Sequence, residues 1–181
     1  MPAELNIPTR LETPKGLRIH IGLFGRRNAG KSSLINALTN QQIAIVSDVP
    51  GTTTDPVEKA CELAPVGPVV FIDTAGIDDV GKLGHLRTDR TMSVLGWMDL
   101  ALIVCDAAGI TDYEKELFRI VTANKTPAIV VLNKTDLHAP EAPVISTIKS
   151  FNLPFVSVSA SEHIGIDTLR SAIIRTIQEE T

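Results

Sequence analysis

Short apolar runs alternate with segments of helical periodicity along most of the chain. Four continuous runs are rich in Ile, Leu and Val: residues 17–24, 68–72, 100–104 and 128–132. Such runs are typical of strands that are buried on both faces of a parallel sheet. Two later segments place apolar residues at helical spacing, Leu117 with Val121 and Leu169 with Ile173 and Ile177. The alternation predicts an α/β fold with a mostly parallel sheet between two layers of helices.

Composition agrees with one compact domain. The chain has 181 residues, of which 44% are hydrophobic, and this is enough to bury a single sizeable core. We expect the domain to occupy residues 17–181. Residues 1–16 contain three prolines, several charges and few apolar side chains, so we expect a flexible N-terminal arm there. The segment Thr111-Asp112-Tyr113-Glu114 has the pattern of a capping box and predicts the start of a helix.

The charge distribution excludes some partners. The formal net charge is −4, and the Lys and Arg residues are scattered, whereas a nucleic-acid surface needs a clustered basic patch. No apolar run is long enough to span a bilayer, and the N-terminus lacks a secretory pattern. We therefore expect a cytoplasmic protein that binds neither nucleic acid nor membrane.

The segment Gly25 to Ser32 matches the phosphate-binding pattern G-x-x-x-x-G-K-S/T and stands between a strand-like and a helix-like segment. Gly25 and Gly30 allow backbone N–H groups to turn toward a β-phosphate. Lys31 adds a positive charge near the β- and γ-phosphates, and the Ser32 hydroxyl is placed to bind magnesium. The residues expected to contact the nucleotide are Gly25, Arg26, Arg27, Asn28, Ala29, Gly30, Lys31, Ser32 and Ser33. For the Arg26 and Arg27 side chains a solvated position is the simplest expectation.

A second signal follows the run 68–72, which ends in Asp73-Thr74-Ala75-Gly76. A carboxylate at the end of such a strand can hold magnesium through water, so Asp73 joins Ser32 as a predicted magnesium residue. Gly76 allows the backbone to approach a γ-phosphate, and its N–H could sense whether that phosphate is present.

A third signal selects the base. The run 128–132 ends in Asn133-Lys134-Thr135-Asp136. The Asp136 carboxylate can accept two hydrogen bonds from guanine, each worth ~1.5–3 kcal/mol, whereas adenine would present a lone pair there. Asn133 would connect this loop to the phosphate loop, and the Lys134 stem would cover one face of the base. The backbone N–H groups of Ser159 and Ala160 follow another strand-like run and are expected to reach the guanine O6, although Ser161 stands where a lysine is usual.

With these motifs in this order, the chain resembles the translation-factor-related class of small GTPases over nearly its whole length. The resemblance implies a Ras-like, three-layer P-loop GTPase fold with a six-stranded sheet, GTP or GDP as ligand, and magnesium. The segment Asp48 to Asp55 is similar to switch I of that class. Matching Gly-Thr-Thr-x-Asp residue by residue puts the magnesium-binding threonine at Thr53, beside Thr52.

Asn28 and the Gly-Thr-Thr-x-Asp motif together resemble the potassium-activated branch of the class, which includes the tRNA-modification GTPases and the FeFe-hydrogenase maturation GTPases. The resemblance implies a potassium ion held by Asn28, Ser47 and Val49, where it replaces an arginine finger. The alternative for Asn28 is a hydrogen bond that braces the loop. Ile77 stands where many GTPases carry a glutamine that positions water. A glutamate of the tRNA-modification relatives corresponds to His85, which is either a weak catalytic candidate or a solvent-facing residue.

The FeFe-hydrogenase maturation GTPases resemble the chain most closely, over residues 17–28, 43–56 and 73–79. This resemblance implies a GTPase domain that serves cluster assembly or delivery, with radical-SAM maturases and apo-hydrogenase as partners. The dimerisation and iron–sulfur domains of that family are expected to be absent from this chain, so a homodimer would form through regions outside it. Cys61 and Cys105 are the only cysteines and cannot supply a Cys-rich cluster site.

Two alternatives remain open at the level of sequence. The first is a stand-alone, ribosome-linked or tRNA-linked GTPase. The second is a nucleotide-occupied regulatory module in which hydrolysis is incidental, because an intrinsic rate of about 10⁻⁴ s⁻¹ is expected without a finger or a glutamine. The remaining histidines suggest no ligand role, and His20 is expected at a surface or edge position of its strand.

Overall fold

The computed structural model describes residues 18–39, 57–74 and 88–181. The predicted N-terminal arm and the segment similar to switch I lie outside these residues. The same holds for six residues with predicted roles, Ser47, Val49, Thr52, Thr53, Gly76 and His85.

Strands and helices alternate along the described residues. The elements are β1 (Ile19–Phe24), α2 (Lys31–Thr39), β2 (Val57–Leu63), β3 (Gly67–Asp73), α3 (Thr88–Leu95), β4 (Leu100–Asp106), α4 (Asp112–Ala123), β5 (Ala128–Asn133), α5 (Ala142–Ser150), β6 (Phe155–Ser157) and α6 (Ile166–Glu179). All four apolar runs seen in the sequence are strands, as predicted. Within the described residues, no helix combines the length and apolar character needed to cross a membrane.

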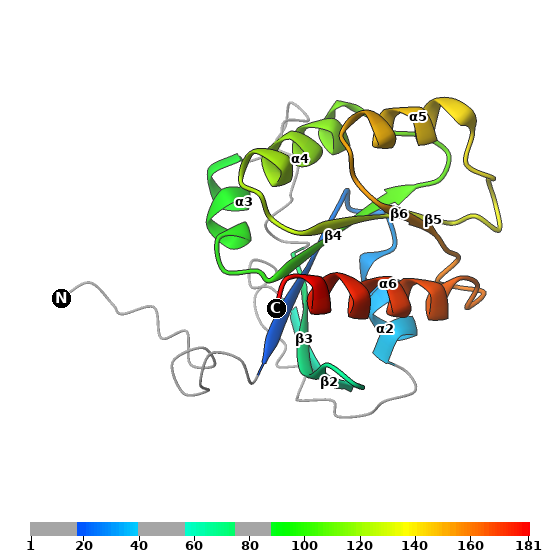
Figure 1. Cartoon of the computed structure of the whole chain (residues 1–181). Helices are drawn as coiled ribbons and strands as arrows, with labels where there is room; N and C mark the ends of the chain where they lie inside the picture. The colour runs from blue at the N-terminus through cyan, green and yellow to red at the C-terminus, as the bar shows by residue number, and fades with distance from the viewer. Residues whose placement is uncertain (1–17, 40–56, 75–87) are drawn as a thin grey trace.

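The strands form one six-stranded sheet in the order β2-β3-β1-β4-β5-β6. Neighbouring strands are parallel except for β2, which pairs with β3 in antiparallel register. Helices α2 and α6 cover one face of the sheet, and α3, α4 and α5 cover the other (Figure 1). The predicted three-layer α/β fold with a mostly parallel sheet is therefore confirmed.

Each face of the sheet has its own apolar core. Leu169, Ile173 and Ile177 of α6 are buried in the core shared with α2, whereas Leu117 and Val121 of α4 are buried in the opposite one. The helical spacing noted in the sequence therefore marks the faces that pack on the sheet. Central strands contribute to both cores because successive side chains point to opposite faces.

His20 differs from the sequence expectation, because it is only 5% exposed and does not lie at an edge. It belongs to β1, which lies between β3 and β4, so helices cover both of its faces. Its backbone N–H donates to the Asp99 carboxylate over 2.8 Å, and its ring meets Trp97 edge to face at a centroid distance of 5.7 Å. A buried imidazole is tolerated here because polar and aromatic groups surround it.

Candidate nucleotide-binding site

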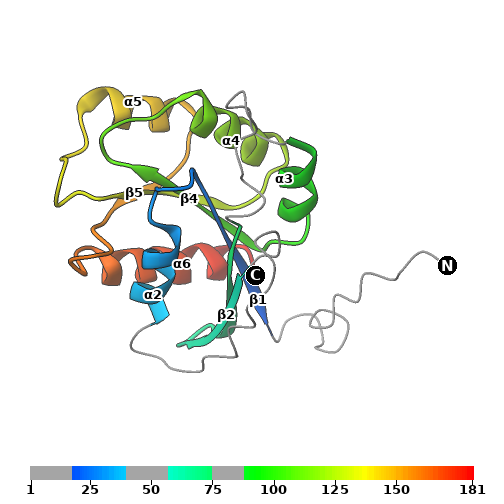
Figure 2. The ribbon, with the colours of Figure 1, turned by 180° about the vertical axis from the view of Figure 1, so that it is seen from behind.

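The predicted motifs lie at one edge of the sheet, because parallel strands end on the same side. The phosphate loop follows β1, Asp73 ends β3, Asp106 ends β4, and Asn133 ends β5. Figure 2 shows β1 leading through the phosphate loop into α2, which packs beside α6. This arrangement places the N-terminus of α2 at the loop, where a helix attracts anions.

Two glycines allow the phosphate loop to fold closely against its neighbours. Gly25 has φ +150°, and a Cβ there would lie 2.3 Å from the carbonyl oxygen of Val104 in β4. Gly30 has φ +95°, and a Cβ there would lie 2.3 Å from the side-chain nitrogen of Asn133. Any side chain at either position would push the loop away from the strand or the guanine motif.

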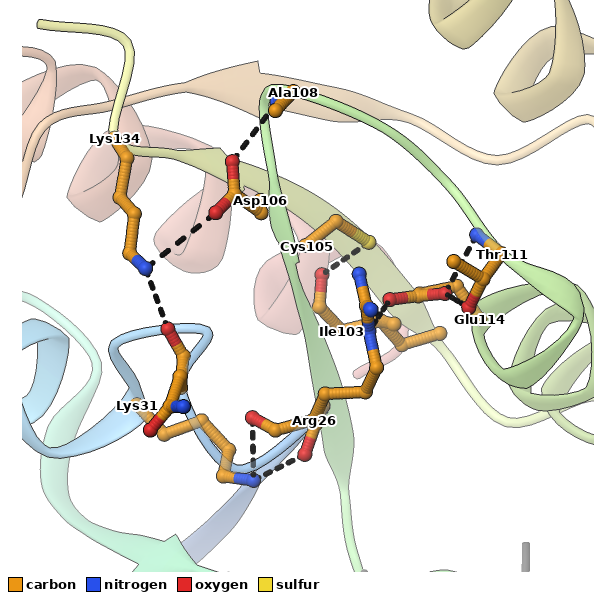
Figure 3. A network of polar contacts seen from close by, with 11 residues as sticks. Arg26, Lys31, Ile103, Cys105, Asp106, Ala108, Thr111, Glu114 and Lys134 are labelled. Carbon is orange, nitrogen blue, oxygen red and sulfur yellow. Dashed lines mark hydrogen bonds and ion pairs between the residues drawn. The ribbon is translucent and has the colours of Figure 1, made fainter. Parts of the chain in front are cut away.

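Lys31 is 3% exposed although it carries an ammonium group. The ammonium donates to the carbonyl oxygens of Gly25 and Arg26, the second over 3.4 Å (Figure 3). The carbonyl groups of the loop itself therefore compensate the buried charge, which lies within the curve of the loop. A phosphate bound there would meet a cation that is already desolvated.

Ser32 and Asp73 come together although 41 residues separate them in the sequence. The Ser32 hydroxyl donates to a carboxylate oxygen of Asp73 over 2.8 Å, and Asp73 is 5% exposed. Hydroxyl and carboxylate oxygens are hard ligands of the kind that magnesium takes in proteins. The residues present thus fit the magnesium site that the sequence predicts.

Asn133 joins three motifs through its side chain, which is 3% exposed. Its amide nitrogen donates to the carbonyl oxygen of Ala29 over 2.9 Å. Its amide oxygen accepts from the backbone N–H of Ala160 over 3.0 Å. The connection between the guanine loop and the phosphate loop that the sequence suggests for Asn133 is present in the structure.

Lys134 bridges two other segments. Its ammonium donates to the carbonyl oxygen of Asn28 over 2.6 Å and lies 3.4 Å from a carboxylate oxygen of Asp106 (Figure 3). The backbone of Lys134 has φ +64°, a left-handed conformation that non-glycine residues rarely adopt. Such conformations are more frequent at functional sites than elsewhere. Asp106 was not among the residues predicted from sequence. Like Asp73 and Asn133, Asp106 is a polar residue at the end of an apolar run. This pattern could have identified Asp106 as a site residue from the sequence.

The base end of the site centres on Asp136. The Ser159 hydroxyl donates to its carboxylate over 2.8 Å, which fixes the orientation of that group. The backbone N–H of Ser159 donates to Ile164, and that of Ala160 donates to Asn133. The two N–H groups predicted to reach the guanine O6 therefore have partners within the protein. Contact with O6 would require Ala160 to exchange one hydrogen bond for another.

Comparison with known proteins identifies the family. Residues 20–134 match the family described as 50S ribosome-binding GTPase. The chain belongs to this family. It is a GTP-binding GTPase domain, as the motifs of the site predict, and its fold is the one expected from the sequence.

The similar proteins are larger than this GTPase domain. The chain is 37% identical over 171 residues to the tRNA modification GTPase MnmE of Picosynechococcus sp., covering 88% of the chain and 35% of that protein. It is 35% identical over 177 residues to GTPase Der of Wolinella succinogenes, covering 92% and 37%. The chain thus spans about a third of the length of these relatives. A crystal structure of Aquifex aeolicus Era bound to GDP and AlF4− aligns with a TM-score of 0.67 at 28% identity, covering 88% of this chain and 56% of Era.

Within the GTPase domain, the Arg26 side chain has a position that sequence reasoning missed. Its Nε lies 2.6 Å from a carboxylate oxygen of Glu114, and Glu114 is 1% exposed. The prediction that the Arg26 side chain is solvated is therefore wrong for Nε, which contacts Glu114. The side chain as a whole remains 40% exposed. Arg27 is exposed, as expected. Glu114 was recognised in the sequence only as part of a capping box, which is also present.

The two cysteines of the GTPase domain are buried. Burial raises the pKa of the Cys61 thiol from 9.0 to about 11, against the opposing effect of Arg170. Burial also raises the pKa of Cys105, and the nearby Glu114 carboxylate adds to the shift. Both thiols are therefore protonated at neutral pH and behave as small apolar side chains, as expected for Cys105.

Proposed function

We propose that this GTPase domain binds magnesium-GTP along the sheet edge between the phosphate loop and Asp136. The observation that carries the proposal is the convergence of three motifs through direct contacts. Ser32 meets Asp73 at 2.8 Å, and Asn133 meets the phosphate loop at 2.9 Å. The phosphates would lie in the loop and against Lys31, and the base would lie against Asp136.

Magnesium completes the phosphate end of this site. Ser32, Asp73 and Thr53 are the residues proposed to hold it. Held there, magnesium would supply positive charge that offsets the negative charge of the phosphates during hydrolysis. The protein supports that role with a hydroxyl and a buried carboxylate that already share a hydrogen bond. Gly76 would contribute a backbone N–H to the γ-phosphate.

The carboxylate of Asp136 is proposed to select guanine. The Ser159 hydroxyl donates to one of its oxygens, which leaves lone pairs that can accept from the N1–H and the amino group of guanine. Lys134 is held between the Asn28 carbonyl and Asp106, so that its apolar stem can lie against the ring. Adenine would instead place a lone pair opposite this carboxylate.

A potassium-stimulated reaction is the next part of the proposal. Asn28 lies in the phosphate loop within the described residues, and its side chain is exposed. With Ser47 and Val49 it would hold the ion. Held there, potassium would supply positive charge near the phosphates, which is the role of an arginine finger. The aliphatic side chain of Ile77 cannot orient the attacking water. We therefore expect the hydrolysis rate to depend on another group that positions this water. His85 is a candidate for that group.

Steady-state GTP hydrolysis in potassium chloride and in sodium chloride tests this part. The two salts are compared at equal ionic strength, because general screening would otherwise imitate a bound ion. We expect faster turnover in potassium and loss of that difference in Asn28→Ala. Asn124→Ala, which changes an exposed asparagine at the C-terminal end of α4, should still hydrolyse GTP faster in potassium than in sodium. Equal turnover in both salts, with GTP still bound, would contradict the potassium proposal.

For the whole protein, we propose a role in assembling or delivering the metal cluster of FeFe-hydrogenase. The support is the resemblance over residues 17–28, 43–56 and 73–79, of which the middle run is longer than the general GTPase motifs. Radical-SAM maturases and apo-hydrogenase would be the partners. An iron–sulfur domain and a dimerisation region would lie outside this chain, which spans about a third of the relatives it matches.

A tRNA-linked or ribosome-linked role is the second candidate. It is favoured by the similarity to a tRNA modification GTPase at 37% identity and to Der at 35%. The full-length protein, purified without oxygen, distinguishes the two. Bound iron and activation of apo-hydrogenase would support the maturation role. Absence of iron together with specific tRNA or ribosome binding would support the second candidate.

A regulatory module that holds nucleotide without productive turnover is the third reading. It would apply if the rate stayed near the slow value of about 10⁻⁴ s⁻¹ under all salts and with the full-length protein. The same hydrolysis assay therefore separates it from the potassium-stimulated enzyme.

A further inference from the structure

One buried carboxylate serves two segments of this domain. Glu114 belongs to the first turn of α4 and is 1% exposed. One of its oxygens accepts from the backbone N–H of Thr111 over 2.8 Å and from the Thr111 hydroxyl over 2.5 Å. The other accepts from Nε of Arg26 over 2.6 Å (Figure 3). The same side chain therefore caps a helix and binds the phosphate loop.

Sheet topology explains how these segments meet. Strands β1 and β4 are parallel neighbours, so the phosphate loop after β1 and the start of α4 after β4 lie at the same edge. Gly25 brings the loop against the backbone of β4 at Val104. The next residue, Arg26, is then within reach of the first turn of α4.

Arg26 is held at two points. Glu114 holds its guanidinium group, while its backbone carbonyl accepts from the Lys31 ammonium over 3.4 Å. A buried carboxylate that lost its cation would be strongly disfavoured, so the pair resists separation. Because the carbonyl and the side chain belong to one residue, fixing the guanidinium group also limits how the loop around Lys31 can turn.

We propose that Glu114 is a positioning residue of the GTPase site, which holds the phosphate loop in its binding conformation through Arg26. The proposal rests on the assignment of residues 25–32 as the phosphate loop. Glu114 acts through Arg26 and not on the nucleotide. A loop that already has its binding conformation loses less conformational entropy when the nucleotide binds. The Glu114–Arg26 pair therefore increases nucleotide affinity.

Glu114→Gln separates the two roles of this side chain. A glutamine at this position of a capping box still accepts from Thr111, but its neutral amide cannot form the ion pair with Arg26. We expect GDP and GTP affinity to fall on the order of 10- to 100-fold, with the helix content unchanged. Glu116→Gln is the matched control, because Glu116 lies on the same helix and pairs with Arg119 over 3.1 Å at the surface. It should bind nucleotide as the wild type does.

Substitutions of Arg26 test the other partner. Arg26→Gln should weaken nucleotide binding about as much as Glu114→Gln, and the double variant should be no weaker than the worse single one, because both remove one interaction. Arg26→Lys keeps the cation and should bind more tightly than Arg26→Gln. Since 40% of the Arg26 side chain is exposed, these variants test the proposal even if Glu114→Gln fails to fold.

The proposal is overturned if Glu114→Gln and Arg26→Gln lower the free energy of unfolding while the folded protein binds GDP with wild-type affinity. Additive losses of affinity in the double variant would overturn it too. Lys31→Ala separates this failure from a failure of the site assignment. If Lys31→Ala abolishes GTP binding while Glu114→Gln binds normally, the phosphate loop stands and only the role of Glu114 falls.

Discussion

The side-chain amide of Asn133 donates a hydrogen bond to the backbone carbonyl of Ala29 over 2.9 Å, across 104 positions of sequence. This contact joins the phosphate end of the site to the base end. It also explains the glycine at position 30, where a Cβ would lie 2.3 Å from the nitrogen of the same amide. The two ends of a bound nucleotide would therefore meet loops whose relative position is already set.

Removing this connection should weaken binding of the whole nucleotide. Asn133→Ala removes the hydrogen bonds to the Ala29 carbonyl and from the Ala160 N–H, so the two loops would have to be ordered relative to one another when the nucleotide binds. We expect GDP affinity to fall on the order of 10- to 100-fold, measured by titration calorimetry. Asn124→Ala, at an exposed position, serves as the control. Wild-type affinity in Asn133→Ala would show that the two loops hold their positions without this amide.

Loss of the Lys31 ammonium should abolish productive GTP binding. The charge is buried among the carbonyl groups of the loop, where a polyphosphate would gain an interaction that water does not screen. Lys31→Ala is compared with Lys149→Ala, which removes an exposed lysine of α5. Fluorescence titration with a labelled GTP analogue and magnesium gives the affinities. Undiminished binding by Lys31→Ala would refute the assignment of the phosphate loop.

Base preference should follow the side chain at position 136. Asp136→Asn replaces an acceptor by a group that can also donate, so the C2 carbonyl of xanthine becomes a suitable partner. The Ser159 hydroxyl can still donate to the new amide oxygen. We expect the preference for GDP over xanthosine diphosphate to fall on the order of 10- to 100-fold in competition binding, since each charge-assisted bond is worth ~1.5–3 kcal/mol. Asp167→Asn, at an exposed position of α6, should leave the preference unchanged. An unaltered preference in Asp136→Asn would remove Asp136 from the base site.

The stability of the domain should depend on the ionisation of Cys61 above pH 9. Burial raises the pKa of this thiol from 9.0 to about 11 in the folded state. Below pH 9 the thiol is protonated in both states, and its contribution to stability is complete. Between pH 9 and 11 the unfolded chain loses the proton more readily, so that contribution declines as the pH rises.

Urea unfolding of the wild type and Cys61→Ala measures this effect. Other groups titrate in the same pH range, and the difference between the two proteins isolates Cys61. The quantity of interest is the free energy of unfolding of the wild type minus that of Cys61→Ala. We expect this difference to decrease between pH 9 and 11. A difference that stays constant over this range would mean that the thiol has the same pKa in the folded and the unfolded protein.

Much of the fold follows from local pattern. The four apolar runs became strands, and the spacing of Leu117 and Val121 identified the buried face of α4, because burial on a sheet requires apolar residues at fixed intervals. The capping box at Thr111 marked the start of that helix. The motifs were enough to propose which loops bind the phosphates and which bind the base, because each motif follows its own strand.

His20 shows where local pattern was insufficient. A histidine in an apolar run indicates a surface or edge position when the order of strands is unknown. The tertiary structure instead places β1 between β3 and β4, with Trp97 and Asp99 beside the imidazole and its backbone N–H. Strand order depends on which strands pair over long stretches of chain, and no single segment carries that information.

By itself, the sequence determined the residue pattern from which the site is proposed: a glycine-bounded loop with Lys31, a carboxylate after a buried strand, and the loop that contains Asp136. Those features depend on residue type and short spacing, which can be recognised without coordinates. Only the tertiary structure decided that Arg26 pairs with Glu114 and that Lys134 lies between Asn28 and Asp106. These pairs join residues that are far apart in the chain, and they form because parallel strands bring the loops after β1, β4 and β5 to one edge of the sheet.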